Sequence, residues 1–485
     1  MLKSAIIPLF VALATLAPST MAHPGESAEH HLAEARAIQA SHQYLKRSGT
    51  AYSGCSNSAQ KRSLNDAVAE RRAAEIDVLR AGVVARKADL TKRQAPSGTA
   101  GAQESMPSGT MGAGGPDGNG TRGGNSTGGG GGGGSASFDT YGESLLNTSH
   151  SSTRTDLTSN STSSDLFDSS ASGNDTACLL QPEVTIGPYW VAGEYVRSDM
   201  SEDQSGIPIY MSTQVIDVAT CEPVVGLYWE MWHANASGVY SGVVASGNGD
   251  STDETNINAT FCRGIQPTDD LGVARIQSIF VGHYGGRAQH VHVVGHANAT
   301  VYSNGTIGTG SSGDGDSVAL HIGQLFFDQD LLDAVALVSP YSENTQAFTE
   351  NSEDSILAQS AVEGASDPFF EYVYLGDSIE DGIYAWVTVG INTNETRTTQ
   401  AASYLDADGG HTGTNSLDVG GGGGMGGNVT ATDSANATDP IAASTETNSV
   451  AATDGLVAAA SASEIVGSSS NAARRAIPTF GYWRA

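Results

Sequence analysis

The sequence predicts an all-β fold, a β-sandwich of short mixed strands with few helices, and three observations in residues 176–400 support this. Runs rich in β-branched and aromatic residues, such as IPIYMSTQVIDV, LYWEMWHA and GIYAWVTVGIN, are separated by turns of Gly, Asn and Asp. One segment, FDQDLLDAVALV, has helical spacing instead. The strands do not alternate with helices, which favours a sandwich over a parallel sheet.

Composition divides the N-terminal part into two further regions. In residues 1–22, Lys3 precedes a short apolar run, and small residues surround an expected cut after Ala22, which is typical of a secretory signal. Residues 23–93 predict two amphipathic helices from apolar residues at helical spacing: Leu32, Ala35 and Ile38, then Leu64, Val68, Ile76, Leu79 and Val83. The dibasic pair Lys92 and Arg93 indicates a processed pro-region; a helical cap that stays attached is the equal alternative.

Two regions carry almost no large apolar side chains. Residues 94–175 contain STGGGGGGGS, and residues 401–485 contain DVGGGGGMGG. Such chains cannot bury enough apolar surface to offset their conformational entropy. We expect a disordered glycosylated linker and a low-complexity tail. Twelve N-x-S/T sequons, together with the signal, predict a secreted glycoprotein, either free outside the cell or associated with a cell wall.

The net charge limits the kinds of binding partner, and the cysteine spacing limits the disulfides. The chain has 53 acidic and 23 basic residues and a net charge of −30, which argues against nucleic acid and anionic membranes as partners. The polar end NAARRAIPTFGYWRA predicts no membrane anchor. Cys55, Cys178, Cys221 and Cys262 are irregularly spaced, so we expect one disulfide among the last three, with its pairing open. The oligomeric state is also open.

The stretch GHYGGRAQHVHVVGH, residues 282–296, carries the strongest chemical signal. On a strand, His290 and His292 share one face while Val291 faces the other side, so both imidazoles can reach one ion. A solvated or core-edge histidine pair is the alternative. Tyr284 lies just upstream, and Tyr240 ends WHANASGVY on an expected neighbouring strand end. Two phenols with two imidazoles suit Fe(III), although each tyrosine alone could be a packed aromatic.

Longer motifs then show a resemblance to a known family. The chain contains PEVTIGPYW, IDVATCEPVVGLYWEMWHANASGVYSG, FCRGIQPTDDLGVARIQSIFVGHYGGRAQHVHV, HIGQLFFDQDLL and DGIYAWVTVGIN in this order. These match the patterns W-x-x-N-x-x-G-x-Y, R-G-x-x-x-T-D-x-x-G and G-x-Y-x-G-R-x-x-H-x-H. The region resembles the intradiol ring-cleavage dioxygenases, with a catechol or protocatechuate dioxygenase-like core of the secreted fungal type.

The resemblance implies a site and a reaction. Its non-haem Fe(III) ligands would be Tyr240, Tyr284, His290 and His292, with water or hydroxide at a fifth position. The substrates would be an ortho-diphenol and O₂, and the ring would open between the two hydroxylated carbons to a muconate-type diacid. By the same resemblance, Tyr284 would leave the metal and accept a substrate proton, and Arg287 would stabilise negative charge on the substrate. No organic cofactor is implied.

Some positions depart from the family pattern. Tyr189 and Trp190 correspond to an aromatic segment of the family's substrate pocket, although Trp190 replaces an expected tyrosine; packed core aromatics are the alternative. Ala234 stands where relatives usually have cysteine, and Cys262 where they have an aliphatic residue. This swap implies a re-routed bridge, with Cys221 as one candidate partner.

Two further hypotheses remain beside the enzyme. The first is a non-catalytic cell-wall or matrix glycoprotein that keeps the iron-binding fold, with the sequon-rich arms carrying the function. The second is a cupin-type H-x-H site, which needs a glutamate shortly after the histidines, and HVHVVGHANATV contains none. His233, His283 and His296 fall outside the implied ligand set and are expected to lie around the site or at the surface.

Overall fold

The computed structural model describes residues 59–94, 136–152, 186–245, 250–308, 317–363, 366–397, 399 and 401–413. The predicted signal, the first predicted helix and most of the two low-complexity regions lie outside them.

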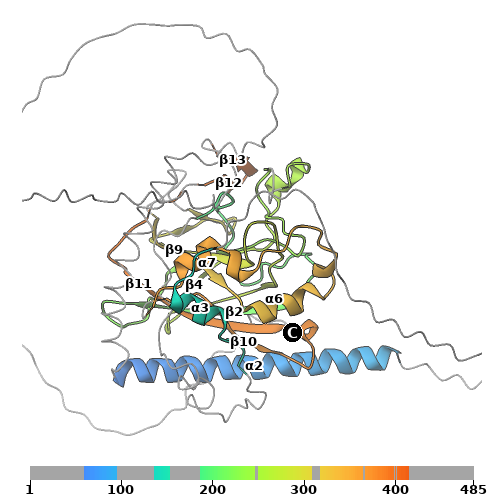
Figure 1. The fold of residues 1–485 in the computed structure, drawn as a ribbon. Helices are drawn as coiled ribbons and strands as arrows, with labels where there is room; N and C mark the ends of the chain where they lie inside the picture. The colour runs from blue at the N-terminus through green and yellow to red at the C-terminus, as the bar shows by residue number, and fades with distance from the viewer. Residues whose placement is uncertain are drawn as a thin grey trace, which may run out of the picture. The chain divides into compact units, whose positions relative to one another are not determined.

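Two four-stranded sheets form the centre of the fold (Figure 1). The first has the order β10 (Glu371–Tyr374), β11 (Ile383–Ile391), β2 (Pro208–Asp217) and β5 (Val273–Ile279). The second has the order β4 (Arg263–Pro267), β3 (Tyr228–Trp232), β6 (His290–Ala297) and β9 (Val318–Phe326). Within these two sheets only β11 and β2 pair in parallel. The predicted all-β fold class is confirmed.

The hydrophobic core lies between the two sheets. From the first sheet, alternate residues such as Ile209 and Met211 on β2 enter it, and from the second sheet Met231, Val291 and Val293 meet them. This is the period-two pattern of strands, in which successive side chains point to opposite faces. The inner faces of both sheets are therefore apolar, and the remaining side chains of each strand point outwards.

Shorter elements surround the sandwich. They are the strands β1 (Val191–Ala192), β12 (Ser403–Asp406), β13 (Gly409–Thr412), β7 (Thr300–Val301) and β8 (Ile307–Gly308), the helices α3 (Thr140–Leu146), α6 (Gln329–Ala336) and α7 (Ser355–Ser360), and the 3-10 turns η1 (Glu254–Asn258), η2 (Tyr341–Glu343), η3 (Asn351–Glu353) and η4 (Ile379–Asp381). The helix α6 confirms the helical prediction for FDQDLLDAVALV.

Described elements also extend past the domain limits predicted from composition. The helix α3 lies inside the predicted linker 94–175, and Leu145 on it packs with Phe326 and Leu357 in a buried cluster. At the other end, β12 and β13 lie inside the predicted tail; β12 pairs with β1, and β13 pairs with β12. Composition averaged over a long region hides such short apolar segments, since a few side chains are enough to dock them.

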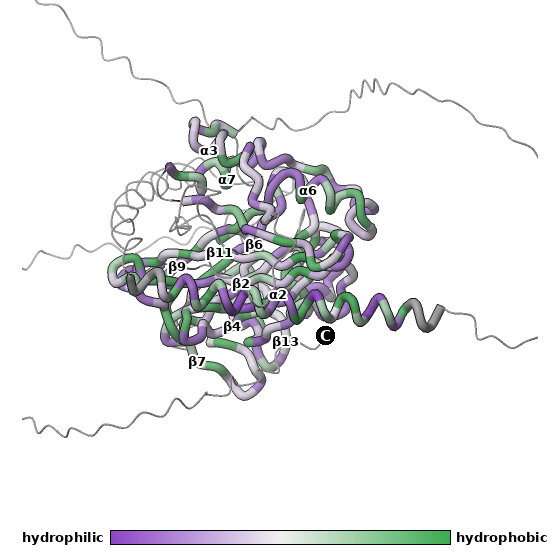
Figure 2. The backbone as a smooth tube through the Cα atoms, turned by 90° about the horizontal axis from the view of Figure 1, so that it is seen from below, coloured by the Kyte–Doolittle hydropathy of each residue, from purple (hydrophilic) through white to green (hydrophobic). Residues whose placement is uncertain are grey.

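The helix α2 (Ala59–Gln94) lies along the outer face of the first sheet (Figure 1; Figure 2). Its apolar side recurs at helical spacing, and Val68, Ile76, Leu79 and Val83 are buried there. This confirms the second of the two helices predicted in residues 23–93. Among the described residues, no helix is both long and apolar enough to cross a membrane.

Polar contacts join α2 to outward-facing groups of the sheet. The Arg72 guanidinium, which is buried, donates to the Ser212 hydroxyl at 3.3 Å and to the Val387 carbonyl at 3.2 Å. Glu75 accepts from the Tyr384 hydroxyl at 2.6 Å and from Arg275 at 2.6 Å. Strand β2 is consequently buried on both of its faces, although it belongs to a sheet with only one apolar core beside it.

The cysteines correct one prediction. Cys262 is a free, buried thiol, and burial raises its pKa to about 12, so the re-routed bridge expected for it is wrong. The physical reason is its place inside the hydrophobic core between the sheets, where its hydrogen-bond partner is Ser278. Cys221 is disulfide-bonded. Cys55 and Cys178 lie outside the described residues.

We predict that Ile76→Ala lowers the free energy of unfolding by about 2–5 kcal/mol, because it removes a fully buried side chain and leaves a cavity between α2 and the sheet. Urea denaturation of the full chain measures this. Val78→Ala is the matched control, since Val78 is 60% exposed on the same helix and its loss should change stability by only about 0.5 kcal/mol. Equal effects of the two substitutions would contradict the docking of α2.

Candidate metal centre and active site

The two histidines of the H-x-H motif begin strand β6 and face away from the sandwich core. Val291 and Val293 belong to the core cluster between the sheets, whereas His290 and His292 stand on the opposite face. The predicted alternation is therefore confirmed. Strand β6 is an inner strand between β3 and β9, so His292 is paired on both sides, with Trp232 and Gln324. His290 is paired with Phe326 on β9.

Four polar atoms from the predicted ligands converge on one point. The His290 Nε2 and His292 Nε2 atoms are 3.0 Å apart, the Tyr284 hydroxyl is 3.3 Å from His290 Nε2, and the Tyr240 hydroxyl is 3.3 Å from the Tyr284 hydroxyl. All four side chains are buried. Donor atoms bound to one ion at metal–ligand distances of about 2 Å lie roughly 3 Å from each other, so the spacing fits a shared metal.

Neighbouring groups orient the imidazoles. His290 Nδ1 donates a hydrogen bond to the Ala288 carbonyl oxygen at 2.6 Å. This leaves the Nε2 lone pair directed at the convergence point. The His292 ring is stacked on the Trp232 indole, with ring centroids 4.7 Å apart and planes 6° apart. The indole comes from β3 directly opposite His292 in the register, so the sheet itself aligns this pair.

The two tyrosines come from loops at the ends of strands. Tyr240 follows β3, and the Asn256 amide, from η1, holds its loop by donating to the Tyr240 and Val243 carbonyls at 2.8 Å and 2.7 Å. Tyr284 and Arg287 form a two-residue bridge around a tight turn. Gly286 has φ +91° in this turn, a conformation that glycine adopts without a steric penalty.

The electrostatics of the phenols favour a highly charged cation. Burial raises the pKa of Tyr240 well above its ordinary value and raises the pKa of Tyr284 to about 12. Both groups are thus neutral phenols unless a strong Lewis acid replaces their protons. A hard trivalent ion such as Fe(III) does this, since it binds phenolate oxygen and imidazole nitrogen together. The donor set therefore fits the metal implied by the family resemblance.

The tyrosines are essential to this interpretation. In the parts of the chain that the structure describes, no three or more His, Cys, Asp or Glu side chains are grouped so that they could hold a metal ion. The convergence point has only two side chains of those types. A site there needs the two phenol oxygens to complete its ligand set.

Arg287 lies beside the four donors and is itself firmly held. Its Nε donates to Asp354 Oδ2 at 2.9 Å, and its NH2 group donates to Gln324 Oε1 at 2.5 Å. The same Asp354 carboxylate accepts from the Ala288 amide at 2.8 Å and caps the N-terminus of α7. Burial alone raises the pKa of Asp354, but Arg287 and the backbone donors outweigh it and lower the pKa, so the carboxylate is anionic.

Asp354 and Gln324 are site residues that the sequence reasoning missed. Gln324 lies on β9 directly opposite His292, and Asp354 lies 67 residues after Arg287. The motif HIGQLFF marks the strand that carries Gln324, so the pairing of adjacent strands was the available signal. For Asp354 the only local sign is its position before a short helix, which is also typical of an ordinary N-cap.

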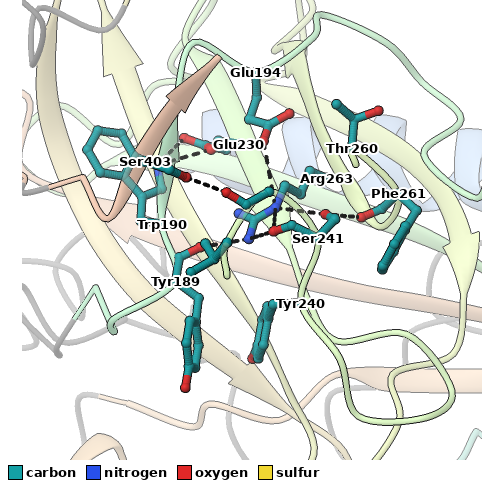
Figure 3. Close-up of polar contacts among 12 residues, drawn as sticks. Tyr189, Trp190, Glu194, Glu230, Tyr240, Ser241, Thr260, Phe261, Arg263 and Ser403 are labelled. Carbon is teal, nitrogen blue, oxygen red and sulfur yellow. Dashed lines mark hydrogen bonds and ion pairs between the residues drawn. The ribbon is translucent and has the colours of Figure 1, made fainter. Parts of the chain in front are cut away.

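The two predicted pocket aromatics lie in different places (Figure 3). The Tyr189 ring is stacked beside Tyr240, with ring centroids 5.1 Å apart, so it borders the four donors. Trp190 points elsewhere: it is fully buried, its Nε1 donates to the Glu230 carboxylate at 3.0 Å, and its ring stacks on His296. The structure brings Tyr189 to the candidate site and does not bring Trp190 there.

Arg263 connects the Tyr189 and Tyr240 segments from behind (Figure 3). It is completely buried on β4, and its NH2 group donates to the Tyr189 carbonyl at 2.7 Å and to the Ser241 carbonyl at 2.6 Å. Its Nε lies 3.6 Å from the carboxylate of Glu194. The planar guanidinium can hold two carbonyls at a fixed separation, so this buried cation sets the spacing of the stacked ring pair.

The other histidines near the motif have partners outside the donor cluster. His296 Nε2 is 2.7 Å from the Glu230 carboxylate, His233 Nε2 is 2.9 Å from the Ser278 hydroxyl, and His283 packs against Phe348. Their expected places outside the ligand set agree with these contacts. Burial lowers the pKa of His233 to about 4, so it is a neutral core residue.

Comparison with known proteins agrees with the motifs. Residues 187–358 match the family model for dioxygenases, and this range contains all four convergent donors and Arg287. Among proteins with curated descriptions, none matches the chain.

Solved structures similar to this chain are named as dioxygenases. An intradiol ring-cleavage dioxygenase from Tetranychus urticae is 27% identical, with 46% of this chain and 98% of that chain covered and a TM-score of 0.37. A hydroxyquinol 1,2-dioxygenase from Pseudomonas putida DLL-E4 is 18% identical, with 47% and 71% covered and a TM-score of 0.27. A catechol 1,2-dioxygenase from Pseudomonas arvilla C-1 is 17% identical, with 48% and 69% covered and a TM-score of 0.28. The family match of residues 187–358 agrees with the recognition of a dioxygenase from the motifs.

We predict that Asp354→Asn in the dioxygenase domain lowers the free energy of unfolding by about 3 kcal/mol, because it leaves the buried Arg287 cation without its anionic partner. Chemical denaturation measures the loss. Asp253→Asn is the matched control: Asp253 is an exposed N-cap of η1, and asparagine caps equally well, so the change should be within about 0.5 kcal/mol. If Asp354→Asn left the free energy of unfolding unchanged, the ion pair would not be what holds Arg287.

Proposed function

We propose that this chain is a non-haem Fe(III) intradiol dioxygenase that opens the ring of an ortho-diphenol with O₂ between its two hydroxylated carbons, giving a muconate-type diacid. The observation that carries the proposal is the convergence of two phenol oxygens and two imidazole nitrogens, linked by successive contacts of 3.3, 3.3 and 3.0 Å, next to a buried arginine. The dioxygenase family match of residues 187–358 supports the same class of reaction.

The proposed roles follow from the chemistry of each group. Tyr240, Tyr284, His290 and His292 would hold the metal. Bound Fe(III) would supply Lewis acidity that draws the diphenol oxygens and activates the ring towards O₂. Tyr284 would accept a proton from the entering diphenol, since a phenol of high pKa in a buried site is a strong base once deprotonated.

Arg287 would stabilise negative charge on the bound diphenol. The neighbouring Asp354 raises its pKa further above the ordinary value against the opposing effect of burial, so the guanidinium stays cationic at any working pH. Because Asp354 and Gln324 hold it on two sides, its charge is aimed before substrate arrives. Such a fixed cation stabilises developing charge without reorganisation.

We also propose that the protein is exported. The predicted signal, the twelve sequons and the bonded state of Cys221 all support an oxidising, glycosylating compartment. The acidic net charge of −30 fits a soluble extracellular protein. Aromatic diphenols released from plant material or lignin are the substrate class that such an exported enzyme would meet.

The alternative is a non-catalytic glycoprotein that keeps the iron-binding fold. The presence of all four donors and of Arg287, held by Asp354, favours the enzyme. A binding-only protein would have no need for a buried cation oriented beside the metal position.

Colour gives the first test. The purified, iron-loaded protein should be red to burgundy through phenolate-to-Fe(III) charge transfer, and the band should shift when catechol is added. Oxygen uptake with a panel of ortho-diphenols then identifies the substrate. Because iron binding displaces phenol protons, the colour should fade as pH falls. A colourless, iron-free protein without diphenol turnover would refute the proposal.

We predict that Tyr284→Phe lowers kcat for diphenol turnover at least about 100-fold, since it removes the proton acceptor. The same substitution should weaken the charge-transfer colour. His292→Ala should abolish iron retention. Tyr374→Phe and His411→Ala change exposed residues of the same types and should leave colour, iron content and turnover unchanged. Unaltered activity in both site variants would exclude this metal centre.

A further inference from the structure

The helix α2 is a permanent layer of the fold rather than a removable cap. Arg72, Ile76 and Val83 are buried against the first sheet, and Glu75 accepts from Tyr384 on the outer face of β11. If α2 left, the sheet would expose groups on two inner strands whose partners lie on the helix. The burial of β2 on both faces depends on that contact.

A second set of contacts fixes the register of α2 along the sheet. Arg71 reaches Asp269 at 2.6 Å, and Arg275 on β5 bridges Glu75 and Asp269 at 2.6 Å and 3.0 Å. Arg80 donates to the Tyr374 carbonyl at 3.1 Å on β10. The helix therefore contacts strands across the whole width of the sheet through groups of both signs, which specifies one docked position.

The end of α2 differs from its middle. Every residue from Val84 to Leu90 is exposed, and the helix runs past the edge of the sandwich in both views (Figure 1; Figure 2). Here the helix contacts the rest of the fold through long side chains: Arg86 is hydrogen-bonded to Tyr210, and Lys87 Nζ lies 2.7 Å from Asp381 in η4. Unwinding this end costs little, because buried apolar contacts of α2 stop at Val83. The dibasic pair Lys92 and Arg93 lies in the last turn of α2.

We propose that the Arg93–Gln94 peptide bond is a processing site and that the cleaved protein remains a two-chain assembly in which α2 stays docked. A serine endoprotease specific for paired basic residues would add water across this amide, leaving a carboxylate on Arg93 and an amino group on Gln94. Cleavage rests on the proposed export, whereas the retention of α2 rests only on its contacts with the sheet. Processing thus breaks the covalent link between the two chains, while α2 remains as a layer of the fold.

The test uses the full chain secreted from a eukaryotic host. N-terminal sequencing and intact mass should find a second chain that starts at Gln94. In gel filtration under reducing, non-denaturing conditions, this chain should elute together with an equimolar amount of the helix-bearing chain. The reductant is required because Cys55 lies on that chain and could tether it. Lys92→Ala with Arg93→Ala should yield a single chain of unchanged elution volume.

Variants of the docked face separate retention from folding. After cleavage, Arg72→Ala should release the helix-bearing chain, because its buried bonds to Ser212 and Val387 are lost. Lys87→Ala is the control, since it removes only an exposed ion pair, and its two chains should still co-elute. An intact Arg93–Gln94 bond in the secreted wild type, or loss of the helix-bearing chain from it, would overturn the proposal. Neither outcome depends on diphenol turnover.

Discussion

The two faces of strand β6 have to satisfy opposite requirements, and the other elements are arranged around this strand. One face of it must be apolar, because Val291 and Val293 fill the core between the two sheets. The other face must present two imidazole nitrogens to the same point, since His290 and His292 are 3.0 Å apart at Nε2. As an inner strand, β6 meets both demands: β9 pairs with it from His290 onwards, and β3 pairs with it from His292 onwards.

The same neighbouring strands also supply the groups that tune the site. Trp232 stacks on His292 from β3, and Gln324 reaches Arg287 from β9. Two loops then bring the tyrosines over this face, and the buried Asn256 and Arg263 hold the Tyr240 loop by its backbone carbonyls. The polar network is costly to bury unless it is well satisfied, so it specifies one arrangement of the loops. The histidines are thus positioned by strand pairing, and the tyrosine loops are positioned by buried hydrogen bonds.

The helix α2 forms an outer layer on the first sheet, on the side away from the core. The first sheet has no second apolar sheet beyond it, and α2 covers its outward side with a mixed apolar and charged surface. Arg72 and Glu75 meet hydroxyls and carbonyls of the strands, which lets a helix of 36 residues dock on a sheet without an all-apolar face. The stability of the sandwich therefore depends on how α2 covers the outer face of β2 and β11.

The strands and the side of β6 that carries His290 and His292 could be predicted from the sequence, because period-two alternation is a local property. The set of Tyr240, Tyr284, His290 and His292 with Arg287 was implied by the resemblance of longer motifs to a known family. Only the tertiary structure decided which distant groups support them. Asp354 joins Arg287 across 67 residues, Trp190 turns to Glu230 instead of the site, and Cys262 enters the core as a free thiol. Such partners are set by how strands and loops pack, and no local pattern in the chain encodes that packing.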